Sequence, residues 1–576
     1  METKNCQNCK NDFTIEPEDF DFYAKIDVPP PTFCPECRMI RRMCWRNNRS
    51  LHRRSCGLCD KTLISMYKDD GVPVFCIECF YGDNWDQFQH AQEIDWSLDF
   101  YSQLFNLFKK QPRIYQYRIG NVVNSDYGNS VVNCKNAYLS FSVIDCEDIM
   151  YSEGIDRSKN TLDSFASYDL DNCSYNMLSN KNFNSHYMVS SQSCIDSFFL
   201  YDCVNCQNCC LSSNLRNQRY VFNNKKLSKE EYDQAVNNLN LNLYSGWENA
   251  KTLFNEVYRG ALHKYADIIA SQNVTGNFIL NSKDVFNSFD VTNNSENISN
   301  SFRMIKSKDA FDCQYVLSGE FIYECSSASQ NSYNQVASLL CFSSKNMEYS
   351  MFCKNCSDCF GCIGLKNVKY CILNKQYSKE EYLELVPRLR EFMSRMPFVD
   401  SQQRVYKYGD FFPFSFSPFG YNETVALDYF KISGQEAKDK GYNWKSEEIK
   451  SYNITLGSHD LPDSILEVSD SILSEIIACS NNGDEMTQCT TAYKITPEEL
   501  QFYRQKKLPL PRFCPNCRHY ERLQYRNPMK LYSRQCTCDV PNHDHEGRCE
   551  VEFETSYAPD RPEKVYCEKC YQKEVL

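Results

Sequence analysis

The segment NCKNAYLSFSVIDCEDIMYSEGIDRSKN (residues 133–160) carries the pattern that decides the fold. Asn136, Asp148 and Asn160 recur within it at one fixed interval, and the interval continues on both sides. The complete series is Asn124, Asn136, Asp148, Asn160, Asn172, Asn184, Asp196 and Asn208. A fixed short period of this kind predicts a coil in which each repeat stacks on the next.

The other columns of the repeat favour a β-solenoid. The residue after each Asn or Asp is small in most repeats, and aromatic residues dominate three positions after it, as at Tyr175, Tyr187 and Phe199. Asn tolerates a left-handed turn, and its side chain can form a ladder with its neighbours. We expect about eight stacked rungs over residues 118–224, roughly 38 Å long at the usual strand spacing. The period leaves open whether one coil takes a single repeat or two.

A second, looser array follows and ends like the first. NCQNC (205–209) matches NCSDC (355–359), and LSKEEY (227–232) matches YSKEEY (377–382), both at the same offset along the chain. In the latter pair, Ser and the Glu three residues later form a capping box, which predicts a helix. The fold class expected is therefore mainly β, a duplicated solenoid whose segments each end in a short capping helix that protects an open sheet edge.

The two ends of the chain carry cysteine pairs spaced for metal binding. A CxxC turn presents two thiolates from one backbone loop, and two such turns complete a closed tetrahedral site for structural zinc. Sequential pairing of the N-terminal turns is the simplest arrangement, although the spacing also permits an interleaved one. The expected ligands of about four zinc ions are Cys6, Cys9, Cys34, Cys37, Cys56, Cys59, Cys76, Cys79, Cys479, Cys489, Cys514, Cys517, Cys536, Cys549, Cys567 and Cys570.

The C-terminal copy departs from the N-terminal one in two places. Met486 stands where a cysteine partner of Cys489 is expected, and Cys479 is the obvious substitute. An insert between Cys536 and Cys549 carries Cys538, His543 and His545. These three side chains either bind a further metal or belong to a solvated loop tip, and the loop tip is the favoured interpretation.

Both ends share the motif I-x-P-E-x3-FY followed by P-x-F-CPxCR, at residues 15–38 and 495–518. The motif resembles a treble-clef-type zinc-ribbon family found in bacterial proteins of unknown function. The complete layout resembles uncharacterised proteins of reduced-genome, candidate-phyla bacteria. The resemblance implies an architecture of zinc ribbons at both ends and no established activity.

These features divide the chain into six parts. Residues 83–117 are expected to be a helical connector with one or two amphipathic helices, and LPDSILEVSDSILSEII (461–477) is also expected to be helical. The six segments are a double zinc-ribbon module (1–82), the helical connector (83–117), two solenoid segments with capping helices (118–264 and 265–399), an aromatic and helical connector (400–478) and a second double zinc-ribbon module (479–576).

Basic and aromatic residues cluster in both zinc-ribbon modules. Between Cys34 and Lys61 there are eight Lys or Arg against two carboxylates, and Arg-rich tracts with interleaved aromatics suit contact with phosphate and stacking on bases. Alternatively, these residues solvate the ribbons or bond to their own fold. The expected nucleic-acid contacts are Arg38, Arg41, Arg42, Trp45, Arg46, Arg49, Arg53, Arg54, Arg518, Arg522, Tyr525 and Arg526.

Composition narrows the remaining function classes. No apolar run is long enough for a membrane span, no export signal is evident, and 34 cysteines in such a chain indicate metal sites in a reducing, cytoplasmic setting. No catalytic motif or small-molecule site is evident, so we expect a non-enzymatic protein. The leading hypothesis is binding of nucleic acid, RNA or DNA with RNA favoured, or of ribonucleoprotein, with the solenoid as scaffold.

Two alternatives remain: a protein–protein interaction scaffold, and a metal or redox protein that uses the cysteine runs of the solenoid. Cys203, Cys206 and Cys209 in the first segment mirror Cys353, Cys356 and Cys359 in the second, which Cys362 extends. Such runs can hold an iron–sulfur cluster. Packing of small side chains in a narrow interior is the favoured interpretation of them.

Overall fold

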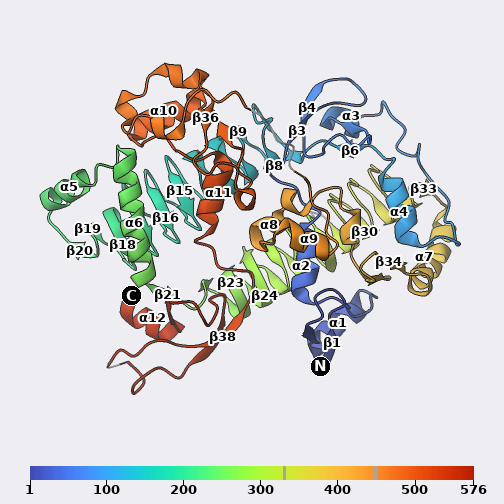
Figure 1. The fold of residues 1–576 in the computed structure, drawn as a ribbon. Coiled ribbons are helices and arrows are strands. Elements are labelled where there is room, and N and C mark those ends of the chain that lie inside the picture. Colours follow the sequence, from blue (N-terminus) through green and yellow to red (C-terminus); the bar gives the residue numbers. More distant parts are fainter. Residues whose placement is uncertain (328–331, 447–451, 542) are drawn as a thin grey trace.

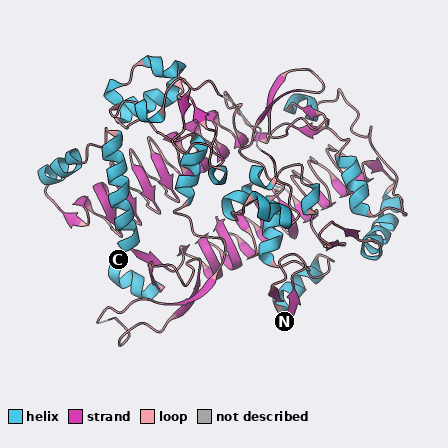
Figure 2. Ribbon diagram, in the orientation of Figure 1, coloured by secondary structure: helices cyan, strands magenta, loops and turns pink. Residues whose placement is uncertain are grey.

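The computed structural model describes residues 1–327, 332–446, 452–541 and 543–576, and its regular elements are mainly strands (Figures 1 and 2). A sheet of 14 strands and a sheet of 12 strands dominate the molecule. We call them the first array (β7 to β20) and the second array (β22 to β33). Helices and cysteine-rich modules lie around the arrays (Figure 1). None of the helices in the described ranges is long and apolar enough to cross a membrane.

The strands of both arrays are short. The first array comprises β7 (Arg118–Ile119), β8 (Asn129–Val132), β9 (Lys135–Tyr138), β10 (Phe141–Ile144), β11 (Glu147–Met150), β12 (Glu153–Asp156), β13 (Lys159–Leu162), β14 (Phe165–Tyr168), β15 (Ser174–Met177), β16 (His186–Val189), β17 (Phe198–Tyr201), β18 (Gln207–Ser213), β19 (Arg219–Phe222) and β20 (Lys225–Lys226). The second comprises β22 (Ile268–Ile269), β23 (Gln272–Leu280), β24 (Lys283–Thr292), β25 (Glu296–Ser299), β26 (Phe302–Ile305), β27 (Lys308–Gln314), β28 (Ile322–Ser326), β29 (Tyr333–Val336), β30 (Lys345–Glu348), β31 (Ser357–Phe360), β32 (Lys369–Ile372) and β33 (Lys375–Gln376).

The remaining elements belong to the modules and connectors. The two-stranded pairs are β1 (Glu2–Asn5) with β2 (Asp12–Ile15), β3 (His52–Ser55) with β4 (Thr62–Ser65), β5 (Val74–Phe75) with β6 (Arg113–Ile114), β21 (Leu262–Lys264) with β40 (Lys564–Tyr566), β34 (Phe398–Val399) with β35 (Val405–Tyr406), β36 (Ile477–Ala478) with β37 (Ala492–Tyr493) and β38 (Tyr532–Gln535) with β39 (Glu552–Thr555). The α-helices are α1 (Pro17–Lys25), α2 (Pro35–Met43), α3 (Ile77–Tyr81), α4 (Phe100–Phe108), α5 (Lys229–Asn238), α6 (Tyr244–Gly260), α7 (Lys379–Arg395), α8 (Val425–Tyr429), α9 (Gly434–Asp439), α10 (Pro497–Lys506), α11 (Pro515–Leu523) and α12 (Glu568–Val575).

Strand pairing in the first array gives the length of one coil. Phe141 of β10 pairs in parallel with Asn129 of β8 and with Glu153 of β12, so each step equals one repeat of the Asn/Asp series. A second row of strands, β9 to β11 to β13, has the same step. The chain therefore returns to the same place once per repeat, which answers the question that the sequence left open.

The corners of the coil explain the Asn column. From residue 130 to residue 223, every third residue has a positive φ, so each coil turns at four corners. All eight members of the predicted Asn/Asp series lie at such corners, where their short polar side chains tolerate the left-handed conformation. The other corners include bulky residues such as Tyr187, Phe199 and Leu178, which the sequence did not predict in this conformation.

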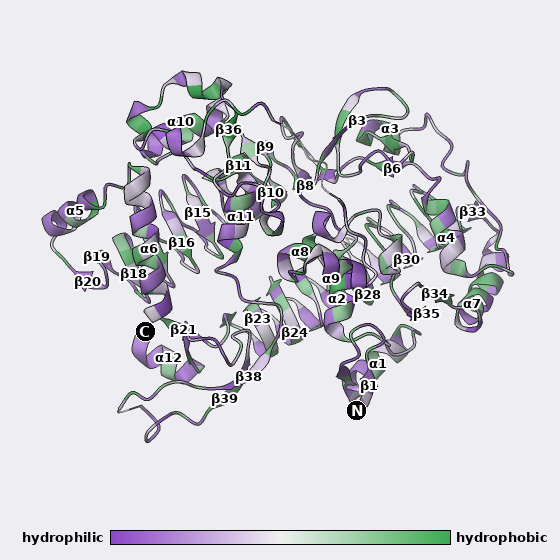
Figure 3. Cartoon of the chain, viewed as in Figure 1, coloured by the Kyte–Doolittle hydropathy of each residue, from purple (hydrophilic) through white to green (hydrophobic). Residues whose placement is uncertain are grey.

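Side chains stabilise the corners from outside and from inside. Outside, Asn136 accepts a hydrogen bond from Asn124 (2.8 Å) and donates one to Asp148 (2.7 Å), so the expected ladder forms. Inside, Ser164 accepts a hydrogen bond from the backbone N–H of Asn176 one coil ahead (3.2 Å) and donates one to the carbonyl of Leu162 (3.1 Å). Hydrophilic and hydrophobic residues are consequently interspersed along the strands (Figure 3).

The second array keeps this scheme with less regular spacing. The offset between paired residues is one residue shorter than the repeat for Gln272 with Lys283, and one residue longer for Lys283 with Glu296. From β29 onwards the offset equals the repeat of the first array. A register shift between Val274 and Gly276 accompanies the first irregular step. The looser spacing of the sequence therefore corresponds to local changes in the number of residues per coil.

Each array ends in a helix as predicted. Both capping boxes are present, between Ser228 and Glu231 before α5 and between Ser378 and Glu381 before α7. The helices pack against the last parallel strand of their array, α5 on β19 and α7 on β32. The main-chain groups at that end of each sheet are also covered by an antiparallel strand, β20 or β33.

One helix prediction was wrong. Residues 461–477 form short 3₁₀ turns, including Ile465–Glu467 and Asp470–Ser474, and not one α-helix. Their Ser side chains bond to nearby backbone, as Ser464 does by accepting from the N–H of Leu466, and this competes with helix formation. In the 83–117 connector, α4 is one of the one or two helices expected, and the preceding residues 83–99 are turns, bends and irregular segments.

The internal ladder makes a prediction about Ser164. Ser164→Val leaves the buried N–H of Asn176 without its acceptor, which costs about 1–3 kcal/mol. Ser164→Cys is the matched control, because Cys134 already takes the same role toward the N–H of Cys146 (3.3 Å). Denaturant unfolding of full-length protein checks this. Equal stability of the Val and Cys variants would contradict the ladder.

Candidate metal centres

The structure brings the sixteen predicted cysteines together in four groups of four. Within each group all sulfur atoms lie within 4.8 Å of one another. The groups are Cys6, Cys9, Cys34 and Cys37; Cys56, Cys59, Cys76 and Cys79; Cys479, Cys489, Cys514 and Cys517; and Cys536, Cys549, Cys567 and Cys570. The sequential pairing is therefore the one that the N-terminal module adopts.

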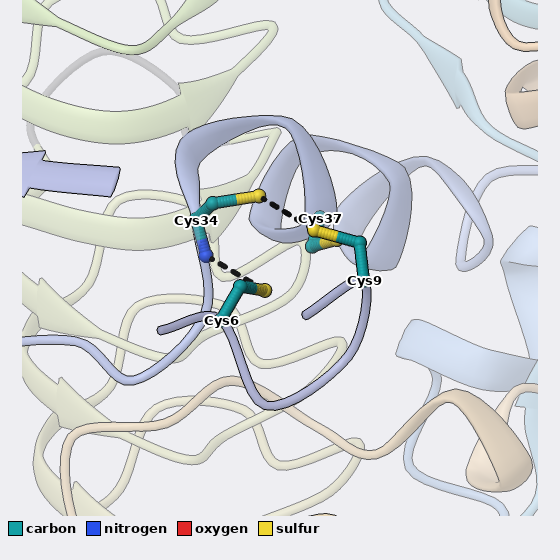
Figure 4. Close-up of side chains that lie close together, drawn as sticks. All are labelled: Cys6, Cys9, Cys34 and Cys37. Carbon is teal, nitrogen blue, oxygen red and sulfur yellow. Dashed lines mark hydrogen bonds between the residues drawn. The ribbon is translucent and has the colours of Figure 1, made fainter. Parts of the chain in front are cut away.

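Distances between the sulfurs fit one metal ion at the centre of each group. A tetrahedral ion with metal–sulfur bonds of about 2.3 Å requires sulfurs about 3.8 Å apart. The Sγ atoms of Cys9 and Cys34 are 3.7 Å apart, and those of Cys59 and Cys76 are 3.9 Å apart. Figure 4 shows the first group, with its four side chains gathered between a loop and the start of a helix.

The four groups share one local geometry. The third cysteine of each, Cys34, Cys76, Cys514 or Cys567, is the N-cap residue of a helix. Its backbone N–H also donates to the sulfur of the first cysteine, at 3.2 Å in the group of Cys6 and at 3.2–3.4 Å in the other three. The unpaired N–H groups and positive end of a helix N-terminus stabilise thiolates, and thiolates are the metal-binding form of cysteine.

In two of the groups, hydrogen bonds between the thiols also favour the thiolate form of one cysteine. Hydrogen bonding with Cys34 and then Cys37 lowers the pKa of Cys6 far below its usual range. In the third group, hydrogen bonding with Cys479 and Cys489 lowers the pKa of Cys514 in the same way. Hydrogen bonding with Cys34 raises the pKa of Cys37, and hydrogen bonding with Cys479 raises that of Cys517, so the thiols of each group hold their protons unequally.

Cys479 completes the third group in place of the missing CxxC partner. It lies just after β36, which pairs with β37, and its sulfur is 3.8 Å from that of Cys517. Its backbone N–H donates to the carbonyl of Thr491, on the far side of the loop that contains Cys489. The short β36–β37 pair thus positions ligands of this site, as the β1–β2 hairpin positions Cys6 and Cys9 of the first group.

The predicted basic face of the N-terminal module is not exposed. Arg38, Arg41 and Arg42 on α2 are at most 2% exposed, because α2 packs against β27 and β28 of the second array. Asp312 lies 3.1 Å from the guanidinium of Arg38 and 3.5 Å from that of Arg42. Both Arg41 and Arg42 also pair with Glu324.

The C-terminal module repeats this contact on the first array. Arg518 and Arg522 on α11 are buried and both pair with Asp163, at 3.0 Å and 2.6 Å. Arg518 also bonds to the hydroxyl of Tyr503, as Arg38 does to that of Tyr23. We call the two contacts arginine clamps: Arg38 and Arg42 on Asp312, and Arg518 and Arg522 on Asp163.

Burial raises the pKa of Asp312 to about 6, while Arg38 and Arg42 oppose this rise. The carboxylate therefore depends on both guanidiniums to remain charged inside the protein. A buried ion pair of this kind contributes little when intact but is costly to break.

Most other predicted nucleic-acid contacts are also internal. Trp45 and Tyr525 are buried. Arg46 lies 3.5 Å above the ring of Tyr315, and Arg526 lies 3.5 Å above that of Tyr429. Arg46 further donates to Ser142 of the first array and Ser327 beside the second, so it joins the two arrays.

Three residues of the predicted set remain. Arg49 connects Glu153 of the first array to Asn516 of the C-terminal module. Arg54 bonds to Asp69 and Val72 of its own module. Arg53 is exposed. The prediction of exposed basic faces is therefore wrong for the buried arginines. The alternative, bonding within their own module, holds for Arg54 and in part for Arg38 and Arg518.

Sequence reasoning missed the acidic partners, although a signal was present. Asp163 occupies the column three residues after Asn160, where aromatic residues dominate the other repeats. Asp312 has the same position relative to Asp309 in the second array. In the first array, a lone carboxylate in this mainly aromatic column marked the docking point, whereas the corresponding column of the second array is mixed and gave no such signal.

The cysteines inside the arrays take the place of serine. Cys203 donates to the carbonyl of Tyr201, two residues back, and Cys356 donates to that of Lys354, as Ser164 does to Leu162. The backbone N–H of Cys356 itself donates to the hydroxyl of Ser344 one coil earlier (3.1 Å). This geometry supports packing and local hydrogen bonding as the role of these thiols.

Comparison with known proteins gives no relative from which function can be transferred. No protein-family model matches the sequence, and a search of curated proteins finds no significant match. The function therefore has to be argued from the geometry.

The third group predicts a specific change in metal content. Cys479→Ala removes one ligand of a closed site, so we expect one metal equivalent less per chain by elemental analysis of purified protein. Met486→Leu is the matched control, since Met486 stands where the sequence motif would place a ligand. Unchanged metal content in the Cys479 variant would exclude it as a ligand.

The arginine clamps predict a loss of stability that an exposed basic face would not. Arg518→Met with Arg522→Met leaves Asp163 buried without a partner, which costs about 3–5 kcal/mol. Arg53→Met with Lys61→Met, both exposed, is the charge-matched control. Thermal unfolding of the full-length variants and limited proteolysis of their C-terminal module measure the loss. We expect a lower midpoint and faster cleavage than in the control.

Adding Asp163→Asn to the Arg518/Arg522 double variant removes the unpaired charge and should recover part of the loss. A double variant as stable as its control would show that the clamp does not hold the module.

Proposed function

We propose that this chain is a non-enzymatic scaffold in which four structural zinc ions and two arginine clamps fix a pair of β-solenoid segments. The open faces of these segments bind a protein partner. The burial of the clamp arginines is the observation that carries the proposal. Side chains that would contact phosphate instead hold the modules on the arrays.

The donor sets support zinc as the metal. Four thiolates in a tetrahedron suit zinc, whereas oxygen ligands would favour magnesium or calcium. Each group also has four protein ligands and no position for water, which is typical of a structural site. The ions would then supply the cores that modules of this size cannot build alone.

Register and corner geometry support the solenoid. Parallel strands recur once per repeat in the first array, and serine, cysteine and aliphatic side chains fill the interior. One face of this array, formed by β9, β11, β13 and the coils that follow, carries exposed side chains. Its members include Lys135 and Glu147, which pair at 3.0 Å, and Glu147 also faces Lys159.

Two exposed apolar residues, Phe183 and Ile195, interrupt this polar face and give it a distinct contact point, which we call the apolar step. Phe183 and Ile195 occupy the same position in successive coils and form a parallel bridge. Their side chains remain 46% and 40% exposed. Exposed aromatic and aliphatic side chains within a polar surround are typical of protein–protein contacts.

Photocross-linking tests the proposal at this step. We expect a benzoylphenylalanine in place of Phe183 to give a discrete protein adduct in cells that make the chain. Ile195→Lys should reduce its yield. A cross-linker at Leu466, which is exposed and outside the arrays, is the control. A nuclease-sensitive adduct, or no adduct above the control, would contradict the proposal and return attention to nucleic acid.

A further inference from the structure

The insert in the last module does not form a solvated loop tip. Cys538 is fully buried and the side chain of His543 is only 7% exposed, whereas Asp544 and Glu546 between and beside the histidines point outward. An ion pair between Asp544 and Lys573 of α12 (2.7 Å) holds the insert against that helix. The cysteine and both histidines therefore face the protein.

These three side chains converge on Cys570, which already belongs to the fourth cysteine group. Ligand atoms of Cys538, His543, His545 and Cys570 all lie within 4.8 Å of one another. The Cys538 sulfur is 3.2 Å from Nδ1 of His543, and the Cys570 sulfur is 3.5 Å from Nε2 of His545. A tetrahedral zinc site with bonds of about 2.0–2.3 Å needs sulfur–nitrogen separations of about 3.6 Å.

The outer nitrogens of both histidines have the partners that metal-bound imidazoles require. Nδ1 of His545 lies 2.8 Å from the carbonyl oxygen of Gly547, which can only accept, so Nδ1 carries the proton. Nε2 of His543 lies 3.0 Å from a carboxylate oxygen of Glu574. In both rings the other nitrogen is left with its lone pair directed at the cysteines, as in histidines that ligate a metal.

We propose that the last module binds two zinc ions, and that the thiolate of Cys570 bridges them. One ion has the ligands Cys536, Cys549, Cys567 and Cys570. The second has Cys538, His543, His545 and Cys570. The second ion adds positive charge beside four thiolates, and it organises residues 537–541 and 543–549, which contain no helix or strand.

Metal counting tests the second ion. Native mass spectrometry of full-length protein purified with zinc should show five ions per chain. His543→Ala with His545→Ala should show four, and Cys538→Ser should also show four. His459→Ala, at a solvent-exposed histidine, is the matched control and should retain five.

Cadmium substitution tests the bridge independently of the count. With ¹¹³Cd in the protein, the ion with two sulfur and two nitrogen ligands should resonate apart from the four-sulfur ions. It should also show scalar coupling to one of them through Cys570. This coupling should disappear in the histidine double variant, while the four-sulfur signals remain.

Two outcomes would overturn the proposal. One is four ions in the unmodified chain, and the other is a count that the histidine and Cys538 variants leave unchanged. Five ions without cadmium–cadmium coupling would remove the bridge. None of these results would affect the four-cysteine groups, so failure here is distinct from failure of the proposed function.

Discussion

A buried carboxylate held by two arginines is the constraint on which the rest of the structure depends. Asp163 and Asp312 each lie at a corner of an array with positive φ, and each receives two guanidiniums from one docked helix. Arginines four residues apart on a helix reach the same point, so one carboxylate fixes both the position and the rotation of the helix. Because the same helix also supplies two cysteine ligands at its N-terminus, metal binding and docking are mechanically coupled.

The arrays tolerate such contacts because their own stability is local. Within an array, each coil bonds to the coils before and after it. Backbone groups and serine or cysteine side chains make these bonds inside, and Asn or Asp side chains make them outside. Left-handed corners at residues such as Tyr187 carry a conformational cost of about 1–2 kcal/mol each. Asn and Asp ladders outside the coil and Ser or Cys hydrogen bonds inside it help to offset that cost.

Local chemistry was readable from the sequence, and long-range pairing was not. The Asn/Asp series, the two capping boxes and the substitution of Cys479 for a missing ligand each follow from residue types at short spacing, and all are present. The arginine tracts show why long-range contacts could not be predicted. A basic helix has the same sequence whether it faces solvent or a carboxylate, and the partner of Arg41 is 283 residues away. The helix expected at 461–477 does not form, because serine side chains there bond to the backbone and compete with helical hydrogen bonds.

The arrangement of the clamps also constrains how the chain folds as it is synthesised. The N-terminal helix α2 docks on the second array and the C-terminal helix α11 on the first (Figure 1). At about 5–20 residues per second, α2 waits tens of seconds on the ribosome before Asp312 and Glu324 emerge. Asp163 waits until Arg518 and Arg522 of α11 have emerged. A product that stops before α11 therefore leaves the carboxylate of Asp163 on the first array without its two arginine partners.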